Sequence, residues 1–256
     1  MILFDQIIFG PIHSRRLGLS LGVNLLPVDA KICSFDCVYC ECGFNTTVHE
    51  SVIPNRKQVQ EALEVKLGMM VSEGQIPDVI TFSGNGEPTL HTDFEGIIDD
   101  TLELRNKYCP SAKVSVLSNA TRIHKPHVFA ALQKVDNNIL KFDTAVDDTL
   151  QLMDRPVSKL INVAWLIEHL KRFDGNLIIQ TMFLRGEYDG KKIDNTTNVE
   201  ASAWLKALKE INPKQVMIYS LDRETPAKNL VKVSFEEMNA IADKAREMGF
   251  KVSVAK

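Results

Sequence analysis

The chain has 256 residues, a net charge of −3 at pH 7 and 45% hydrophobic residues, which is typical of an ordinary globular protein. This length can bury one substantial core, so we expect a single domain over residues 1–256, with an extension at 1–18 and a core over about 19–256. The charge excludes a broadly basic surface for nucleic acid. No apolar run approaches the ~20 residues of a membrane span.

Short apolar runs alternate with amphipathic stretches along the chain, and most runs are rich in β-branched residues. Their length predicts buried strands at 19–26, 79–82, 114–117, 139–142, 177–183 and 216–219. Strands that alternate with helices indicate parallel βαβ units with right-handed crossovers. Six strands are fewer than the eight of a closed barrel, so a partial barrel or a doubly wound open sheet fits the pattern.

Helices are predicted between these runs from apolar residues at helical spacing. Two buried faces are expected, formed by Val59, Leu63, Leu67 and Met70, and by Leu160, Val163, Ile167 and Leu170. Capping boxes are expected at 92–95 and 234–237. Asn212 and Gly249 are expected to end two further helices.

Three cysteines follow the first predicted strand in a C-x3-C-x2-C pattern, at Cys33, Cys37 and Cys40. A [4Fe–4S] cubane takes a ligand on each of four irons, so three close thiolates leave one iron open for a substrate or cofactor. The alternative is a zinc site with Cys42 as fourth ligand. The position after the first strand also favours the partial barrel, because barrel folds place their chemistry at strand ends.

Cysteine usage also bears on the compartment. Five cysteines, with three of them bunched, do not make a disulfide framework. A reducing cytoplasm is therefore the expected location. Cys109 lies far from the bunched cysteines and is expected to pack in the core.

Polar residues follow the next predicted strands. Gly86 and Glu87 stand in a glycine-rich turn after the second strand, where glycines let backbone groups approach a ligand and a carboxylate accepts from an ammonium group. Ser118 and Asn119 follow the third strand, and Asp143 follows the fourth. Taken singly, each of these also fits an ordinary turn or cap.

The cysteine loop closely resembles that of the radical S-adenosylmethionine (SAM) enzymes. The turn at 84–88 resembles their G-G-E-P motif, with Asn85 in place of a glycine, and residues 118–120 and 141–144 resemble their T-N-G and S-L-D-A segments. The resemblance implies a (β/α)6 partial barrel and SAM chelated to the open iron. It implies that the cluster cysteines are Cys33, Cys37 and Cys40, and that the SAM contacts are Tyr39, Asn85, Gly86, Glu87, Ser118, Asn119 and Asp143.

The likeness extends over residues 9–11, 14–18, 20–24 and Pro27. With these segments the chain resembles the radical SAM group related to wyosine-tRNA synthase. The archaeal and eukaryotic wyosine enzymes hold a second cluster on cysteines upstream of the first loop. No cysteine precedes Cys33 here. The fold and cofactors are therefore expected to carry over, whereas the tRNA reaction stays an alternative beside the zinc module.

The resemblance also implies partners. An electron donor such as flavodoxin or ferredoxin is expected, and the charge favours a small-molecule or protein-segment substrate over nucleic acid. The polar, glycine-containing stretch at 185–192 predicts a loop, either a lid over the substrate or a solvated connector.

Overall fold

The computed structural model describes residues 2–14, 17–46 and 51–255. Eight strands curl into a half-barrel in the order β1-β2-β3-β4-β5-β6-β9-β11. All neighbours from β2 onward pair in parallel, while β1 pairs antiparallel with β2 at one edge. These strands are β1 (Ile8–Ser14), β2 (Gly18–Val23), β3 (Val79–Phe82), β4 (Lys113–Ser118), β5 (Asn137–Lys141), β6 (Ile178–Met182), β9 (Gln215–Tyr219) and β11 (Val252–Val254).

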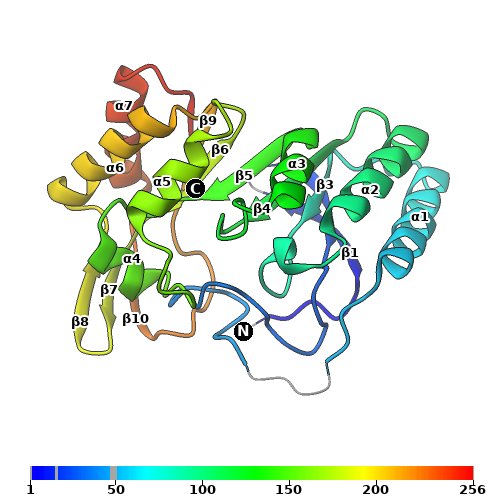
Figure 1. Cartoon of the computed structure of the whole chain (residues 1–256), viewed down its shortest axis with the longest axis horizontal. Helices are drawn as coiled ribbons and strands as arrows, with labels where there is room; N and C mark the ends of the chain where they lie inside the picture. Colours follow the sequence, from blue (N-terminus) through cyan, green and yellow to red (C-terminus); the bar gives the residue numbers. More distant parts are fainter. Residues whose placement is uncertain (1, 15–16, 47–50, 256) are drawn as a thin grey trace.

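Helices flank the sheet, with α1–α3 gathered along one side and α5–α7 along the other (Figure 1). Every residue of β3 is buried, as expected for a strand covered on both faces. The helices are α1 (Arg56–Ser72), α2 (Phe94–Tyr108), α3 (Pro126–Lys134), α4 (Asp147–Met153), α5 (Val163–Lys171), α6 (Asn198–Ile211) and α7 (Phe235–Glu247), with a 3₁₀ turn η1 (Pro88–Leu90). The partial barrel predicted from the sequence is confirmed.

The six predicted strands correspond to β2, β3, β4, β5, β6 and β9. The first was predicted too long: β2 ends at Val23 instead of continuing to residue 26. The reason is local, because the Asn24 side chain bonds both the N–H and the C=O of Leu26 and turns the backbone. The edge strands β1 and β11 were not predicted.

The helix predictions were confirmed for the buried face of α1 and for the N-terminal cap of α7. The predicted apolar residues of α1 are its buried ones, and Ser234 forms the predicted capping box of α7. Asn212 ends α6 in the left-handed conformation, and Cys109 is fully buried. Two details were wrong: Leu160 is exposed ahead of α5, and α2 begins after Asp93 without a side-chain cap.

The N-terminal residues form part of the sheet, since β1 pairs with β2 along most of its length. Arg15 and Arg16, which carry part of the family likeness, lie outside the described residues. Within the described ranges, no helix is long and apolar enough to cross a membrane.

A second, three-stranded sheet lies beside α4 and consists of β7 (Leu184–Tyr188), β8 (Lys191–Asp194) and β10 (Asn229–Lys232) (Figure 1). The stretch 185–192, predicted as a loop, is therefore mostly a β-hairpin. Asp189 and Gly190 both have positive φ, as a two-residue hairpin turn of this hand requires. An Asp-Gly pair is itself a hairpin signal in sequence, so this structure was predictable.

Candidate active site

The cysteine loop follows β2, and its start is held by distant backbone. Ile32 exchanges hydrogen bonds with the turn after β3, accepting from Glu87 N–H and donating to Asn85 C=O. Gly86 has φ +137°, and a Cβ there would lie 1.8 Å from Ile32 O. Only glycine permits this approach, so Gly86 fixes the loop against the sheet.

The middle of the loop is held by the segment after α4. Asp36 N–H donates to Asp154 C=O, Val38 N–H donates to Met153 C=O, and Val157 N–H donates to Ser34 C=O. These bonds satisfy backbone groups of a loop without regular structure. The positions of the cysteines therefore depend on a segment more than a hundred residues later in the chain.

All three cysteines line one cavity at the carboxyl ends of the strands, with a volume of about 140 Å³. Among the predicted contact residues, Tyr39, Gly86, Glu87, Ser118 and Asn119 also line it. The remaining lining residues come from the loop and from the strand ends, and they are Lys31, Phe35, Gly84, Leu117, Lys141 and Gln180.

Glu87 joins the ends of β3 and β4 on one side of this cavity. Its carboxylate accepts from Thr89 N–H at 3.1 Å, Thr89 Oγ1 at 2.5 Å, Ser118 Oγ at 2.8 Å and Asn119 N–H at 2.7 Å. Burial raises the pKa of Glu87, although these four hydrogen bonds act in the opposite direction. Glu87 therefore fixes Ser118 and Asn119 at the cavity wall.

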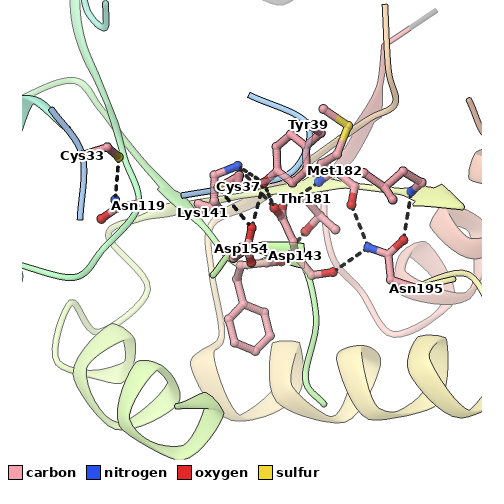
Figure 2. Close-up of polar contacts among 12 residues, drawn as sticks. Cys33, Cys37, Tyr39, Asn119, Lys141, Asp143, Asp154, Thr181, Met182 and Asn195 are labelled. Atoms are coloured by element: carbon pink, nitrogen blue, oxygen red, sulfur yellow. Dashed lines mark hydrogen bonds and ion pairs between the residues drawn. The ribbon is translucent and has the colours of Figure 1, made fainter. Parts of the chain in front are cut away.

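Asn119 connects this side of the cavity to the cysteine loop. Its side-chain Nδ2 donates to Cys33 Sγ at 3.4 Å and to Ser34 Oγ at 3.0 Å. Figure 2 shows the amide directed at the Cys33 sulfur. An amide donor beside sulfur favours the thiolate form that metal binding requires.

Asn85 is fully buried and its side chain bonds away from the cavity. Its amide donates to Phe4 C=O at 2.9 Å and Pro27 C=O at 2.8 Å, and its oxygen accepts from Phe4 N–H at 2.8 Å. The side chain thus ties the N-terminal segment to the turn after β3. Asn85 does not line the cavity.

A second polar cluster lies behind Cys37, at the end of β5. Tyr39 Oη lies within hydrogen-bond distance of both Asp143 and, at 2.9 Å, Asp154 Oδ1, while Lys141 Nζ donates to Tyr39 Oη at 2.6 Å and to Asp143 Oδ2 at 3.2 Å. Cys37 Sγ lies 3.5 Å from Asp154 Oδ1. Figure 2 shows these side chains directed at one another from separate segments. Asp143 itself lies behind Lys141 and does not line the cavity.

The charges of this second cluster depend on one another. Burial disfavours the ammonium of Lys141, but Asp143 and neighbouring acidic groups outweigh burial and raise the pKa of Lys141. Burial raises the pKa of Asp154, and the nearby Asp143 carboxylate raises it further. Lys141 and Asp143 therefore form the charged pair, with Asp154 as the neutral acid beside Cys37.

The three thiols differ in how readily they ionise. Burial raises the pKa of Cys33 to about 12 and raises that of Cys37, whereas a hydrogen bond from Cys42 lowers that of Cys40 to about 6. No three His, Cys, Asp or Glu side chains in the described ranges are gathered around one point as a single metal ion needs. Three separate sulfurs on one cavity suit a cluster, whose thiolates bind different irons.

Sequence reasoning missed Lys141, Asp154 and Gln180. Lys141 follows the apolar pair Ile139 and Leu140 in β5, and Gln180 follows Ile178 and Ile179 in β6, so a long polar side chain directly after buried apolar residues was the available signal. Asp154 offered no comparable signal, because only the fold brings it to Cys37.

Arg155 links the loop to the β7–β8 hairpin. Its guanidinium donates to Tyr188 Oη at 2.6 Å, lies 3.4 Å from Asp36 Oδ2, and stacks over the rings of Phe44 and Tyr188. Arg155 thus connects the hairpin to the cysteine loop, and the Phe44 and Tyr188 rings also lie 5.9 Å apart.

Comparisons with known proteins agree with this geometry. The model of the Radical SAM superfamily matches residues 28–196. A UPF0026 protein of Helicobacter pylori is 30% identical over 234 residues, which is 87% of this chain and 68% of that protein. A protein named GTPase Obg of Brachyspira hyodysenteriae is 28% identical over 236 residues. This match covers 90% of the present chain but only 32% of that protein.

Solved structures share the fold. A radical SAM methyltransferase from Sphaerobacter thermophilus superposes with a TM-score of 0.67 at 15% identity, covering 92% of this chain and 65% of that one. The structure of TYW1 with a lysine–pyruvate adduct bound gives 0.60 at 14% identity, covering 89% and 73%. At such identities the likeness concerns the fold alone.

Proposed function

Because this chain belongs to the radical SAM superfamily of enzymes, which use a [4Fe–4S] cluster and SAM, we propose that it cleaves SAM reductively to abstract a hydrogen atom from a substrate. The observation that carries the proposal is the convergence of Cys33, Cys37 and Cys40 with Gly86 and Glu87 on one strand-end cavity.

Each cysteine ligates one iron of a single cluster in this proposal. Such a cluster, when bound, would supply the electron for reductive cleavage of a carbon–sulfur bond of SAM. The protein supplies position: Gly86 holds the loop against β3, and the segment 153–157 holds its centre. Asn119 orients Cys33, and Asp154 lies beside Cys37.

Gly86, Glu87, Ser118 and Asn119 form the wall that binds SAM. Glu87 already accepts four hydrogen bonds, so in this proposal it orients the donors of Ser118 and Asn119 and adds a negative charge facing the ammonium of SAM. Tyr39 lines the same cavity beside them. Asn85 and Asp143 act indirectly, by holding the turn after β3 and by holding Lys141.

The wyosine-type tRNA reaction is the second candidate, favoured by the fold shared with TYW1. The net charge of −3 argues for a smaller substrate. The zinc alternative rests on Cys42, whose thiol is hydrogen-bonded to Cys40. We place the enzyme in the cytoplasm with a flavodoxin or ferredoxin as reductant, since a labile cluster needs a reducing compartment.

Anaerobic purification followed by iron, sulfide and zinc assays tests the cluster. Iron and sulfide in equal amounts are expected, with slow release of 5′-deoxyadenosine once dithionite and SAM are added. Zinc without iron would reject the radical mechanism. Deoxyadenosine release that rises only with tRNA, together with tight and steeply salt-dependent tRNA binding, would favour the wyosine-type reaction instead.

A further inference from the structure

Lys31 is a buried lysine at the start of the cysteine loop, and the proposed SAM contacts do not include it. Its side chain is 2% exposed, and its ammonium donates to Gly43 C=O at 2.7 Å and lies 3.8 Å from Asp36 Oδ1. Gly43 in turn donates its N–H to Cys40 C=O at 2.8 Å. The ammonium therefore contacts the loop at two residues that flank the pair Cys37 and Cys40.

The Asp36 carboxylate does not neutralise Lys31 alone, because it also lies 3.4 Å from the Arg155 guanidinium. One carboxylate thus faces two cations, so the group formed by Lys31, Asp36 and Arg155 keeps a net positive charge. The Lys141 ammonium, in contrast, forms a one-to-one pair with Asp143 at 3.2 Å. The Arg155 side chain is 33% exposed and is screened by water, so the surplus charge acts inside the protein from Lys31.

This surplus charge lies beside all three cysteines of the loop. Lys31 lines the same cavity as Cys33, Cys37 and Cys40. Burial disfavours the Lys31 ammonium, but the thiolates of Cys40, Cys33 and Cys37 and the Asp36 carboxylate outweigh burial and raise the pKa of Lys31. Because the Lys31 side chain is almost fully buried, water and salt screen its attraction to the sulfurs only weakly.

We propose that the buried Lys31 ammonium stabilises the reduced form of the cluster and thereby raises its reduction potential. This rests on the proposed function, because it assigns a residue to the reduction of the same cluster. A cluster on three thiolates has a net negative charge, which grows by one when it takes an electron from the flavodoxin or ferredoxin. A nearby cation is attracted more strongly to the more negative form. Lys31 thus acts through the charge of the cluster.

The test is a reductive titration of the reconstituted protein with dithionite and without SAM, followed by the electron paramagnetic resonance signal of the reduced cluster. Lys31→Gln removes the charge but keeps an N–H donor, and Lys31→Met removes both. In both variants the ratio of reduced to oxidised cluster should fall at least about tenfold at a given potential, which lowers the midpoint by about 59 mV for one electron. Lys31→Arg should keep the parental midpoint. The matched control is Lys57→Met, whose lysine is 80% exposed on α1, and it should not change the midpoint.

A substitution of opposite sign decides the question if the neutral Lys31 variants assemble no cluster. Asp36→Asn removes a negative charge beside the same ammonium and keeps the Oδ1 atom that accepts from Asn45 N–H at 2.7 Å. The midpoint of this variant should rise. The rise should be smaller than the fall in Lys31→Gln, because the Asp36 side chain is 20% exposed and its charge is better screened.

Three results would overturn the proposal. One is a parental midpoint in Lys31→Gln with normal iron content. Another is a Lys31→Arg variant shifted as far as Lys31→Gln, which would assign the shift to the lost hydrogen-bond geometry instead of the charge. The third is an unchanged or lowered midpoint in Asp36→Asn. A parent protein that assembles no iron cluster would instead reject the proposed function, so the two failures are distinguishable.

Discussion

Two regions border the cysteine loop, and they bury charge in different ways. In the glutamate region (Glu87, Thr89, Ser118 and Asn119) one carboxylate is surrounded by four neutral donors. The lysine region (Tyr39, Lys141, Asp143 and Asp154) balances a cation against two carboxyl groups. The first tolerates burial through hydrogen bonds alone, whereas the second depends on its ion pair. Each region contacts a different cysteine, Cys33 or Cys37.

The largest effect is expected when the cysteines themselves are replaced. It should be the same for the cysteine beside the glutamate region and the cysteine beside the lysine region. Cys33→Ala, Cys37→Ala and Cys40→Ala should each abolish cluster assembly, because each thiolate binds its own iron. Iron and sulfide content after anaerobic reconstitution measures this. Cys42→Ala and the buried Cys109→Ala are the controls and should keep their iron. Loss of metal in Cys42→Ala, with zinc in the parent protein, would contradict the assignment.

Replacing Lys141 should show the clearest difference in stability between the lysine region and the glutamate region. Lys141→Met leaves Asp143 buried without its ion-pair partner and should lower the free energy of unfolding by about 3–5 kcal/mol. Urea denaturation of the cluster-free protein under reducing conditions measures it. Asp143→Asn added to Lys141→Met should recover part of the loss, because the uncompensated charge is gone. Additive effects of the two substitutions would show that the pair is not coupled.

In the glutamate region the expected effect is smaller. Glu87→Ala leaves buried donors of Ser118 and Asn119 unsatisfied and should lower the free energy of unfolding by about 1–3 kcal/mol. SAM affinity should also fall, since the cavity wall loses its orientation and charge, while iron content stays unchanged. Calorimetric titration with SAM checks this, and unaltered SAM affinity would remove Glu87 from the site.

The smallest effect is expected at Asp154, although it is as buried as Asp143. Its Oδ2 is buried and has no hydrogen-bond partner among the described residues. Asp154→Asn keeps the acceptor to Tyr39 and should change the free energy of unfolding by less than about 1 kcal/mol. The same urea titration measures it. A loss as large as that of Lys141→Met would mean that Asp154, and not Asp143, is the charged partner.

The glutamate region was largely predictable from the sequence, because Gly86, Glu87, Ser118 and Asn119 directly follow recognisable buried strands. The six core strands were predictable for the same reason, since continuous apolar runs mark strands covered on both faces. The lysine region was not, apart from Tyr39 and Asp143. Asp154 reaches Cys37 only through the fold, and the direction of the Asn85 side chain depends on the N-terminal segment that packs against it.

The backbone bonds between the cysteine loop and the segment 153–157 bear on how the protein is made. A ribosome adds about 5–20 residues per second, so roughly 6–23 s separate synthesis of Cys40 from synthesis of Val157. Val38 also accepts from Ala227 N–H, and Glu41 pairs with Arg223, later still. During that interval the three cysteines lie in a nascent chain that lacks these tertiary contacts. The backbone contacts that position the three cysteines are therefore complete only after most of the barrel has been translated.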